Sequence, residues 1–97
     1  MFIVSLTYKV ELCEVDQYIE AHISFLETYY AANKFIASGR KEPRTGGVIL
    51  INAQDKAEVD AIINEDPFYI ADVAHYDVTE FIPTMAAKEF EAIKDLI

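Results

Sequence analysis

Hydrophobic and polar residues alternate at the start of the chain. Over Phe2–Lys9, every second residue from the first is apolar or aromatic, and serine and threonine occur between them. A period of two among β-branched and aromatic residues predicts a strand. Three more segments of strand composition follow at Phe35–Arg40, Val48–Asn52 and Val73–Ile82. The pattern therefore predicts four strands.

Between the first two strands, apolar residues recur with the spacing of a helix. They predict one helix that follows a connector at Val10–Glu14 and ends near Asn33, a residue type that tolerates the left-handed conformation after a helix. A second helix is predicted over Asp55–Ile63. A further helical turn begins at Asp66-Pro67, because Asp suits the N-cap and Pro the first helical position. The apolar stripe of the first helix consists of Val15, Tyr18, Ile19, His22, Phe25, Leu26 and Tyr29.

The order of these elements predicts the fold class. It is β-α-β-β-α-β, the split βαβ arrangement of ferredoxin-like α+β folds, with a four-stranded antiparallel sheet and helices on one face. We expect one domain over residues 1–97, with a core over 1–83 and a helical extension over 84–97. Thr84 is expected to cap the extension's helix, whose apolar positions are Met85, Phe90, Ile93 and Ile97.

The composition of the chain predicts that it binds a second copy of itself. The 97 residues are 53% hydrophobic, whereas soluble domains usually contain about 45–50%, and a chain this short buries only about two-thirds of its unfolded surface. The strand Val48–Asn52 is apolar on both faces, although helices can cover only one of them. We therefore expect a homodimer in which two sheets face each other, a dimeric α+β barrel.

Charge and cysteine content exclude some functions. The net charge is −9, which argues against nucleic acid and against anionic membrane surfaces. No apolar run approaches the roughly 18 residues of a membrane span. Cys13 is the one cysteine, and Met1–Tyr8 lacks the basic start of a signal peptide. We expect a cytoplasmic protein.

Two residues are candidates for acid–base chemistry. His22 has a side chain suited to proton transfer at neutral pH, but it could instead be a histidine at the edge of the core. Asp66 could orient the imidazole, or it could only cap the helical turn. The two roles of Asp66 are compatible, since one carboxylate oxygen can cap while the other faces a cleft.

A third candidate, His75, shares one face of the last strand with Asp77 and Thr79. These polar groups could line a cavity or mark a wet region of a dimer interface. His22 and His75 do not have the spacing of a metal site, and no motif joins them. We expect neither a metal nor a cofactor.

Basic residues cluster in the loop between the second and third strands. Arg40, Lys41 and Arg44 lie near Gly39 and the pair Gly46-Gly47. They could form an anion site with accessible backbone N–H groups, or they could be solvated loop charges. The glycines do not match a P-loop or dinucleotide pattern.

Together these features resemble the YciI-like (YCII-related) protein family over residues 1–83. The most specific piece is the combination of a histidine in the first helix with an Asp-Pro-Phe segment. The matching segments are the strand Phe2–Tyr8, His22 followed by Leu26, Ser38-Gly39, Gly46-Gly47-Val48, Glu65-Asp66-Pro67-Phe68, and Tyr76-Asp77-Val78-Thr79-Glu80-Phe81.

The resemblance implies a dimeric α+β barrel, related in architecture to muconolactone isomerase, and an active site in which His22 and Asp66 face a cleft. One branch of the family removes chloride from chlorinated hydroquinones. The resemblance therefore implies lyase- or isomerase-type proton transfer on a small, anionic or aromatic ligand. A non-catalytic metabolite-binding or interaction module on the same barrel is the alternative. This chain has Arg40 where the family often has Pro, which affects the loop shape. The residues expected to bind substrate are Ser38, Gly39, Arg40, Phe68 and His75.

Overall fold

The alternating strand at the start of the chain lies inside the sheet. The computed structural model describes residues 1–96, and β1 (Phe2–Tyr8) pairs antiparallel with both β3 (Gly46–Ile51) and β4 (Ala74–Glu80). β2 (Phe35–Arg40) pairs with β3 at the edge, giving the order β2-β3-β1-β4. The predicted α+β class and ferredoxin-like order are confirmed.

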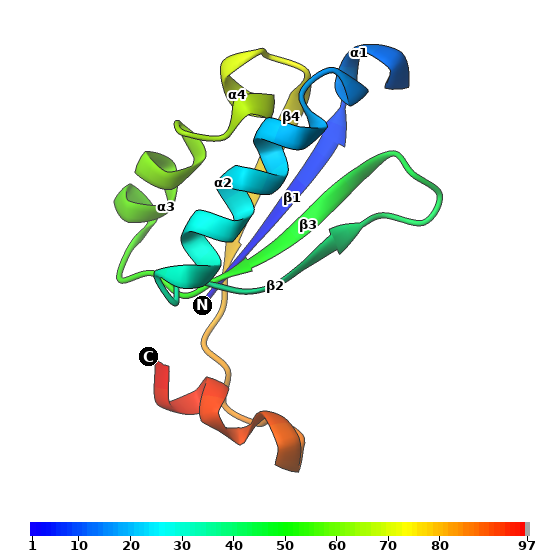
Figure 1. Ribbon diagram of the computed structural model, residues 1–97. Coiled ribbons are helices and arrows are strands. Elements are labelled where there is room, and N and C mark those ends of the chain that lie inside the picture. The colour runs from blue at the N-terminus through cyan, green and yellow to red at the C-terminus, as the bar shows by residue number, and fades with distance from the viewer. Residues whose placement is uncertain (97) are drawn as a thin grey trace.

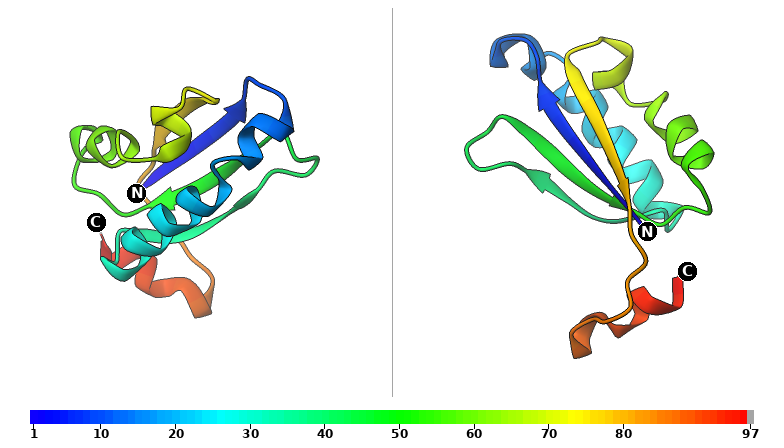
Figure 2. Two further views of the ribbon diagram at one scale, coloured as in Figure 1. Left: turned by 45° about the horizontal axis from the view of Figure 1, so that its top comes forward. Right: turned by 180° about the vertical axis from the view of Figure 1, so that it is seen from behind.

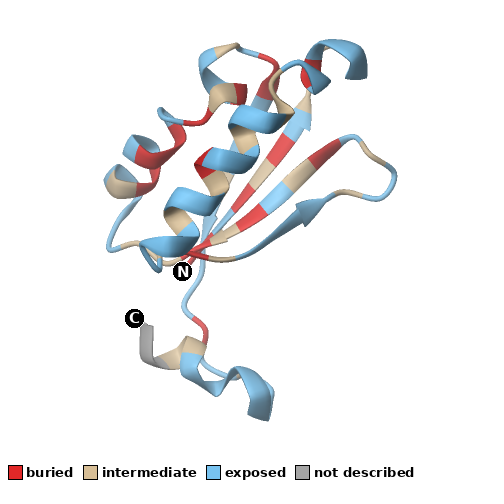
Figure 3. Cartoon of the chain, viewed as in Figure 1, coloured by how far each residue is buried: buried red, intermediate tan, exposed pale blue. Residues whose placement is uncertain are grey.

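All four α-helices cover one face of this sheet (Figures 1 and 2). They are α1 (Leu12–Asp16), α2 (Ile19–Ala31), α3 (Lys56–Ile63) and α4 (Pro67–Ile70). The core fills the space between the layers, because the inward residues of the strands meet the apolar stripes of the helices. Figure 3 shows buried positions along both layers. The largest of the almost fully buried apolar side chains are Met1, Phe2, Val4, Val15, Ile51, Val59 and Phe68.

The single helix predicted before Asn33 is wrong in one respect, because it is two helices. Gln17 and Tyr18 separate α1 from α2, and their backbone N–H groups bond three residues back, to Glu14 and Val15. Such tighter turns change the direction of the chain. Asn33 has a φ of 60°, so its predicted left-handed conformation is confirmed.

The other face of the sheet carries no helix (Figure 2, right). Apolar side chains of Ile3 and Val48 are exposed there, and Leu50 is aligned with Ile3 across the β1–β3 pair. Towards β4 the same face becomes polar, with His75 and Asp77 3.4 Å apart. This open face is defined here by residues 3, 48, 50, 75 and 77.

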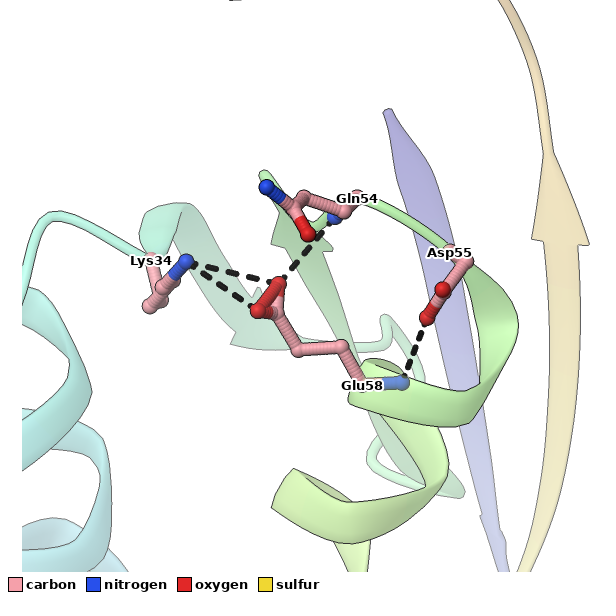
Figure 4. Close-up of polar contacts among 4 residues, drawn as sticks. All are labelled: Lys34, Gln54, Asp55 and Glu58. Carbon is pink, nitrogen blue, oxygen red and sulfur yellow. Dashed lines mark hydrogen bonds and ion pairs between the residues drawn. The ribbon is translucent and has the colours of Figure 1, made fainter.

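At the end of the sheet where β2 begins, a polar cluster ties α3 to the strand (Figure 4). Glu58 accepts hydrogen bonds from Lys34 Nζ at 3.2 and 3.3 Å and from the Gln54 backbone N–H at 3.1 Å. Asp55 caps α3 by accepting from the Glu58 backbone N–H at 2.9 Å. This cluster lies at the opposite end of α2 from the histidine and has a structural role.

The C-terminal extension lies apart from the helix layer (Figure 1). Its helix is a 3-10 helix, Lys88–Leu96, and it begins four residues later than the predicted cap at Thr84. The Phe90 N–H bonds to the Ala87 carbonyl, the three-residue spacing of that helix type. Ile97, the last predicted apolar position, lies outside the described residues. Over the described residues, no helix is long and apolar enough to cross a membrane.

Candidate functional site

An open pocket lies between α2 and the β2–β3 side of the sheet. Its volume is about 500 Å³. Its apolar wall comes from strand and helix residues that also border the core, including Leu6, Leu26 and Phe68. Polar groups reach it from α2 and from the strands around the β2–β3 hairpin: His22, Ser38, Arg40 and Arg44. A concave apolar site with a few convergent polar groups is typical of small-molecule binding.

His22 lines this pocket from the second turn of α2. Its Nδ1 lies 2.8 Å from Oδ1 of Asp66, 44 residues away in the chain. Its ring stacks on Phe68, with 4.0 Å between centroids and 7° between planes. The side chain is 14% exposed. One ring face and one nitrogen are therefore fixed by the protein, and the ring is held in a single orientation at the pocket wall.

Asp66 is 1% exposed and has three hydrogen-bond donors around it. Oδ1 accepts from His22 Nδ1 and also from the Phe68 backbone N–H at 3.0 Å, which caps α4. Oδ2 accepts from the Tyr76 hydroxyl at 2.6 Å. The N-cap and the histidine contact are both present, as the sequence allowed. Both fall on the same oxygen, however, and not on one oxygen each.

This geometry assigns the tautomer of His22. An ionised carboxylate only accepts hydrogen bonds, so the proton shared with Asp66 belongs to Nδ1. In the neutral imidazole Nε2 then carries the lone pair. Since His22 lines the pocket, Nε2 is the atom available to a bound molecule. The arrangement can accept a proton at Nε2 while the buried carboxylate balances the charge that develops on the ring.

The pocket is positively charged in a negatively charged protein. It is bordered by Arg40 and Arg44, whereas none of its lining residues is acidic. Arg44 also contacts Asp16, which lies outside the pocket lining, with its Nη2 2.6 Å from Oδ1 of that residue. Its guanidinium lies 6.0 Å from the ring centroid of Tyr8, which lines the pocket. Lys41 does not join Arg40 and Arg44 in the basic cluster expected from the sequence, because its Nζ donates to Thr7 Oγ1 instead.

Most residues expected to bind substrate lie together. Ser38, Gly39, Arg40 and Phe68 line the pocket with His22, and Ser38 Oγ is 2.7 Å from the Tyr30 hydroxyl. The structure does not bring His75 to them. His75 is exposed on the open face, where strand alternation turns it away from the helices.

Sequence reasoning missed Tyr76 as a member of the site. The sequence did contain a signal for it, because side chains along a strand alternate between the two faces of the sheet. Tyr76 follows His75 directly and therefore points to the opposite face. Its alignment with Leu6 on β1 places it on the helix side of the sheet. The contact with Asp66 depends on how α4 is seated over β4, and no local pattern carries that information.

The fold and this pocket define a class: small ferredoxin-like α+β domains with a histidine–aspartate pair at a ligand-sized pocket. The chain belongs to the YCII-related domain family, whose model matches residues 1–82. Among solved structures it is similar to 5-chloro-2-hydroxyhydroquinone dehydrochlorinase (TftG) from Burkholderia phenoliruptrix AC1100, solved in complex with 2,5-dihydroxybenzoquinone. That match has a TM-score of 0.72 and 21% identity, and covers 82% of this chain and 91% of the other. No curated protein matches the chain.

Membership in this family and the likeness in fold confirm the resemblance seen in the sequence. At 21% identity the dehydrochlorinase shows the fold alone. Within the described residues, no group of three or more His, Cys, Asp and Glu side chains is placed to hold a metal ion.

Proposed function

We propose that this chain is an enzyme that moves a proton on a small molecule, with His22 as the general acid–base and Asp66 as the residue that orients it. The observation that carries the proposal is the 2.8 Å contact between His22 Nδ1 and the buried Asp66 carboxylate. It combines an imidazole whose Nε2 carries a lone pair with a pocket large enough for one ring-sized molecule.

The protons that His22 can accept and return support lyase or isomerase chemistry. Nε2 accepts a proton from a carbon or oxygen acid of the ligand, and the imidazolium that forms is stabilised by Asp66. In an elimination, the electron pair left behind moves through the ligand and leaves with the departing group as an anion. In an isomerisation, Nε2 returns the proton at a different atom. Neither course consumes an oxidant or reductant.

The charge of the pocket supports an anionic or aromatic ligand. Arg40 has no ion pair among the described residues and lines the pocket, so it can neutralise a carboxylate, phenolate or enolate. Chlorinated hydroquinones, on which the structurally similar dehydrochlorinase acts by its name, are therefore the first compounds to test.

We further propose that the chain works as a homodimer through its open face. Ile3, Val48 and Leu50 are apolar there, and within one copy no described helix covers them. Pairing two such faces removes this apolar surface from water.

The proposal is tested by turnover with and without the imidazole. The wild-type protein is incubated with 5-chloro-2-hydroxyhydroquinone and, separately, with a metabolite extract, and chloride release and changes in mass are recorded. We expect conversion by the wild type. His22→Gln, which keeps a donor for Asp66 but cannot shuttle protons, should be slower by a factor of about 10² or more.

His75→Gln is the matched control, because it removes the other imidazole from outside the pocket. It should keep the wild-type rate. Full turnover by His22→Gln would overturn the proposal. Saturable binding of a metabolite that the wild-type protein leaves chemically unchanged would instead favour the non-catalytic binding module.

A further inference from the structure

We propose that Tyr76 is a positioning residue of the site, whose hydroxyl holds the Asp66 carboxylate so that His22 keeps its proton on Nδ1. This inference rests on the proposed function, because it explains how the acid–base residue is kept in its working tautomer. Tyr76 does not line the pocket and is not expected to touch a bound molecule.

The position of Tyr76 is fixed by the sheet and by a second aromatic ring. It lies on β4 opposite Leu6 of β1, and the ring of Tyr69 packs edge-on against it at 5.6 Å and 83°. From this position the hydroxyl reaches Oδ2 of Asp66 at 2.6 Å. The short O–H···O distance is that of a charge-assisted hydrogen bond.

The need for this hydroxyl follows from counting partners. Oδ1 of Asp66 has two donors, the Phe68 N–H and His22 Nδ1, whereas Oδ2 accepts from the hydroxyl of Tyr76. Among the described residues no buried side-chain polar atom lacks a partner. Without the hydroxyl, Oδ2 would be a buried carboxylate oxygen with no donor, a costly state at 1% exposure.

The carboxyl group has two ways to escape that state, and both affect His22. It can bind a proton, after which it is a weaker acceptor for Nδ1–H. It can also rotate towards another donor, which breaks the 2.8 Å contact. In either case the preference for the proton on Nδ1 falls, and the tautomer with the proton on Nε2 becomes populated.

Tyr76 is suited to this task over a wide pH range. Burial, followed by the charge of Asp66 and the hydrogen bond to it, raises the pKa of Tyr76 well above its ordinary value. The phenol therefore stays a donor at neutral and alkaline pH. Tyr29 makes a bond of the same length to Glu65, but Glu65 is exposed and holds no other site residue, so that pair has no such consequence.

The test reads the tautomer of His22 directly, by ¹H–¹⁵N correlation of the histidine rings in the full-length protein near neutral pH. The chain has two histidines, so His75→Gln assigns the signals. We expect His22 in the wild type to show the pattern of the Nδ1–H form. Tyr76→Phe, which keeps the ring and removes the hydroxyl, should lose that single pattern and gain Nε2–H character.

Tyr69→Phe is the matched control. It removes the hydroxyl of the neighbouring ring, which does not bond to the Asp66 carboxylate, and it should leave the His22 signals unchanged. A wild-type His22 pattern in folded Tyr76→Phe would overturn the inference, and so would an equal change in Tyr69→Phe. A lower melting temperature alone would not count as support, since any core defect produces it.

If Tyr76→Phe does not fold, Tyr76→Gln, which brings another donor and no further imidazole, is examined in the same way, and a mixed tautomer overturns the inference. These outcomes differ from failure of the proposed function. The tautomer of His22 can depend on Tyr76 even if the protein has no catalytic activity. Conversely, turnover can require His22 even if the tautomer of His22 does not depend on Tyr76.

Discussion

At the scale of single residues, one buried carboxylate organises the site. Asp66 ends a loop, caps α4, binds His22 and receives the Tyr76 hydroxyl. Buried charges are stable only when their oxygens are fully partnered. The partners in turn are held in place, since His22 stacks on Phe68 and Tyr76 packs against Tyr69. The geometry of the His22–Asp66 pair is therefore preorganised.

Tyr29 gives a prediction about alkaline pH. Burial, and then the hydrogen bond to and charge of Glu65, raise its pKa from 10.0 to about 12. Because the folded protein holds this proton more tightly, the stabilisation is fully present below pH 10 and is lost as pH rises through about 12. Urea unfolding at a series of alkaline pH values should show a steeper loss of stability for the wild type than for Tyr29→Phe. Equal pH dependence in the two proteins would contradict the assignment.

At the scale of elements, the pocket depends on a close approach of strands. A Cβ added to Gly46 would overlap the backbone carbonyl of Leu6, whereas nothing lies within 4 Å of a Cβ added to Gly39. Leu6 and Gly46, on the paired strands β1 and β3, both line the pocket. Thus the glycine at the start of β3 has a packing function, although sequence reasoning gave it a place in a loop.

This contrast predicts unequal effects of the same substitution. Gly46→Ala should destabilise the protein by about 1–3 kcal/mol, because backbone must move to relieve the overlap. Gly39→Ala, on the adjacent strand of the same hairpin, should change stability by no more than about 0.5 kcal/mol. Chemical denaturation of both variants measures the difference. Similar losses in the two would show that the strands adjust freely.

The division of the predicted first helix is also an element-scale effect. The break at Gln17 and Tyr18 lets Val15 point into the core while α2 presents His22 to the pocket. A continuous helix would have kept both residues on one straight stripe. The apolar spacing fits both arrangements, and only the seating of α1 and α2 on the sheet distinguishes them.

At the scale of the whole molecule, the sheet has one covered face and one open face. Leu50 lies on the open face, opposite Ile3 on β1 and Ala37 on β2. If two copies pair through this face, a charge at Leu50 is placed in an apolar interface. Leu50→Glu should therefore be a folded monomer by light scattering and circular dichroism, while the wild type is a dimer.

Ala61→Glu is the control for that prediction, because it adds the same charge to an exposed position of α3, on the helix side. It should leave the dimer intact. A monomeric wild type, or a Leu50→Glu variant that remains dimeric, would exclude the open face as the interface. His75 and Asp77 lie on this same face, which accords with the interface reading of these residues rather than the cavity reading.

Features that depend on neighbours along the chain could be predicted from the sequence. The alternation of Phe2–Tyr8, the stripe that carries His22, and the cap at Asp66-Pro67 are local patterns, since period and capping preference are set by residues a few positions apart. The element order then follows, and with it the ferredoxin-like class. A family resemblance on the same segments added the pairing of His22 with Asp66.

Which side chains meet depends on tertiary packing. The contact between His22 and Asp66 spans 44 residues, and the partner Tyr76 was not singled out for the site. His75 has the same chemistry as His22, yet the register of β4 against β1 turns it to the opposite face. Faces and registers are set by how whole elements pack, and the energy that selects them comes from burial summed over the entire core.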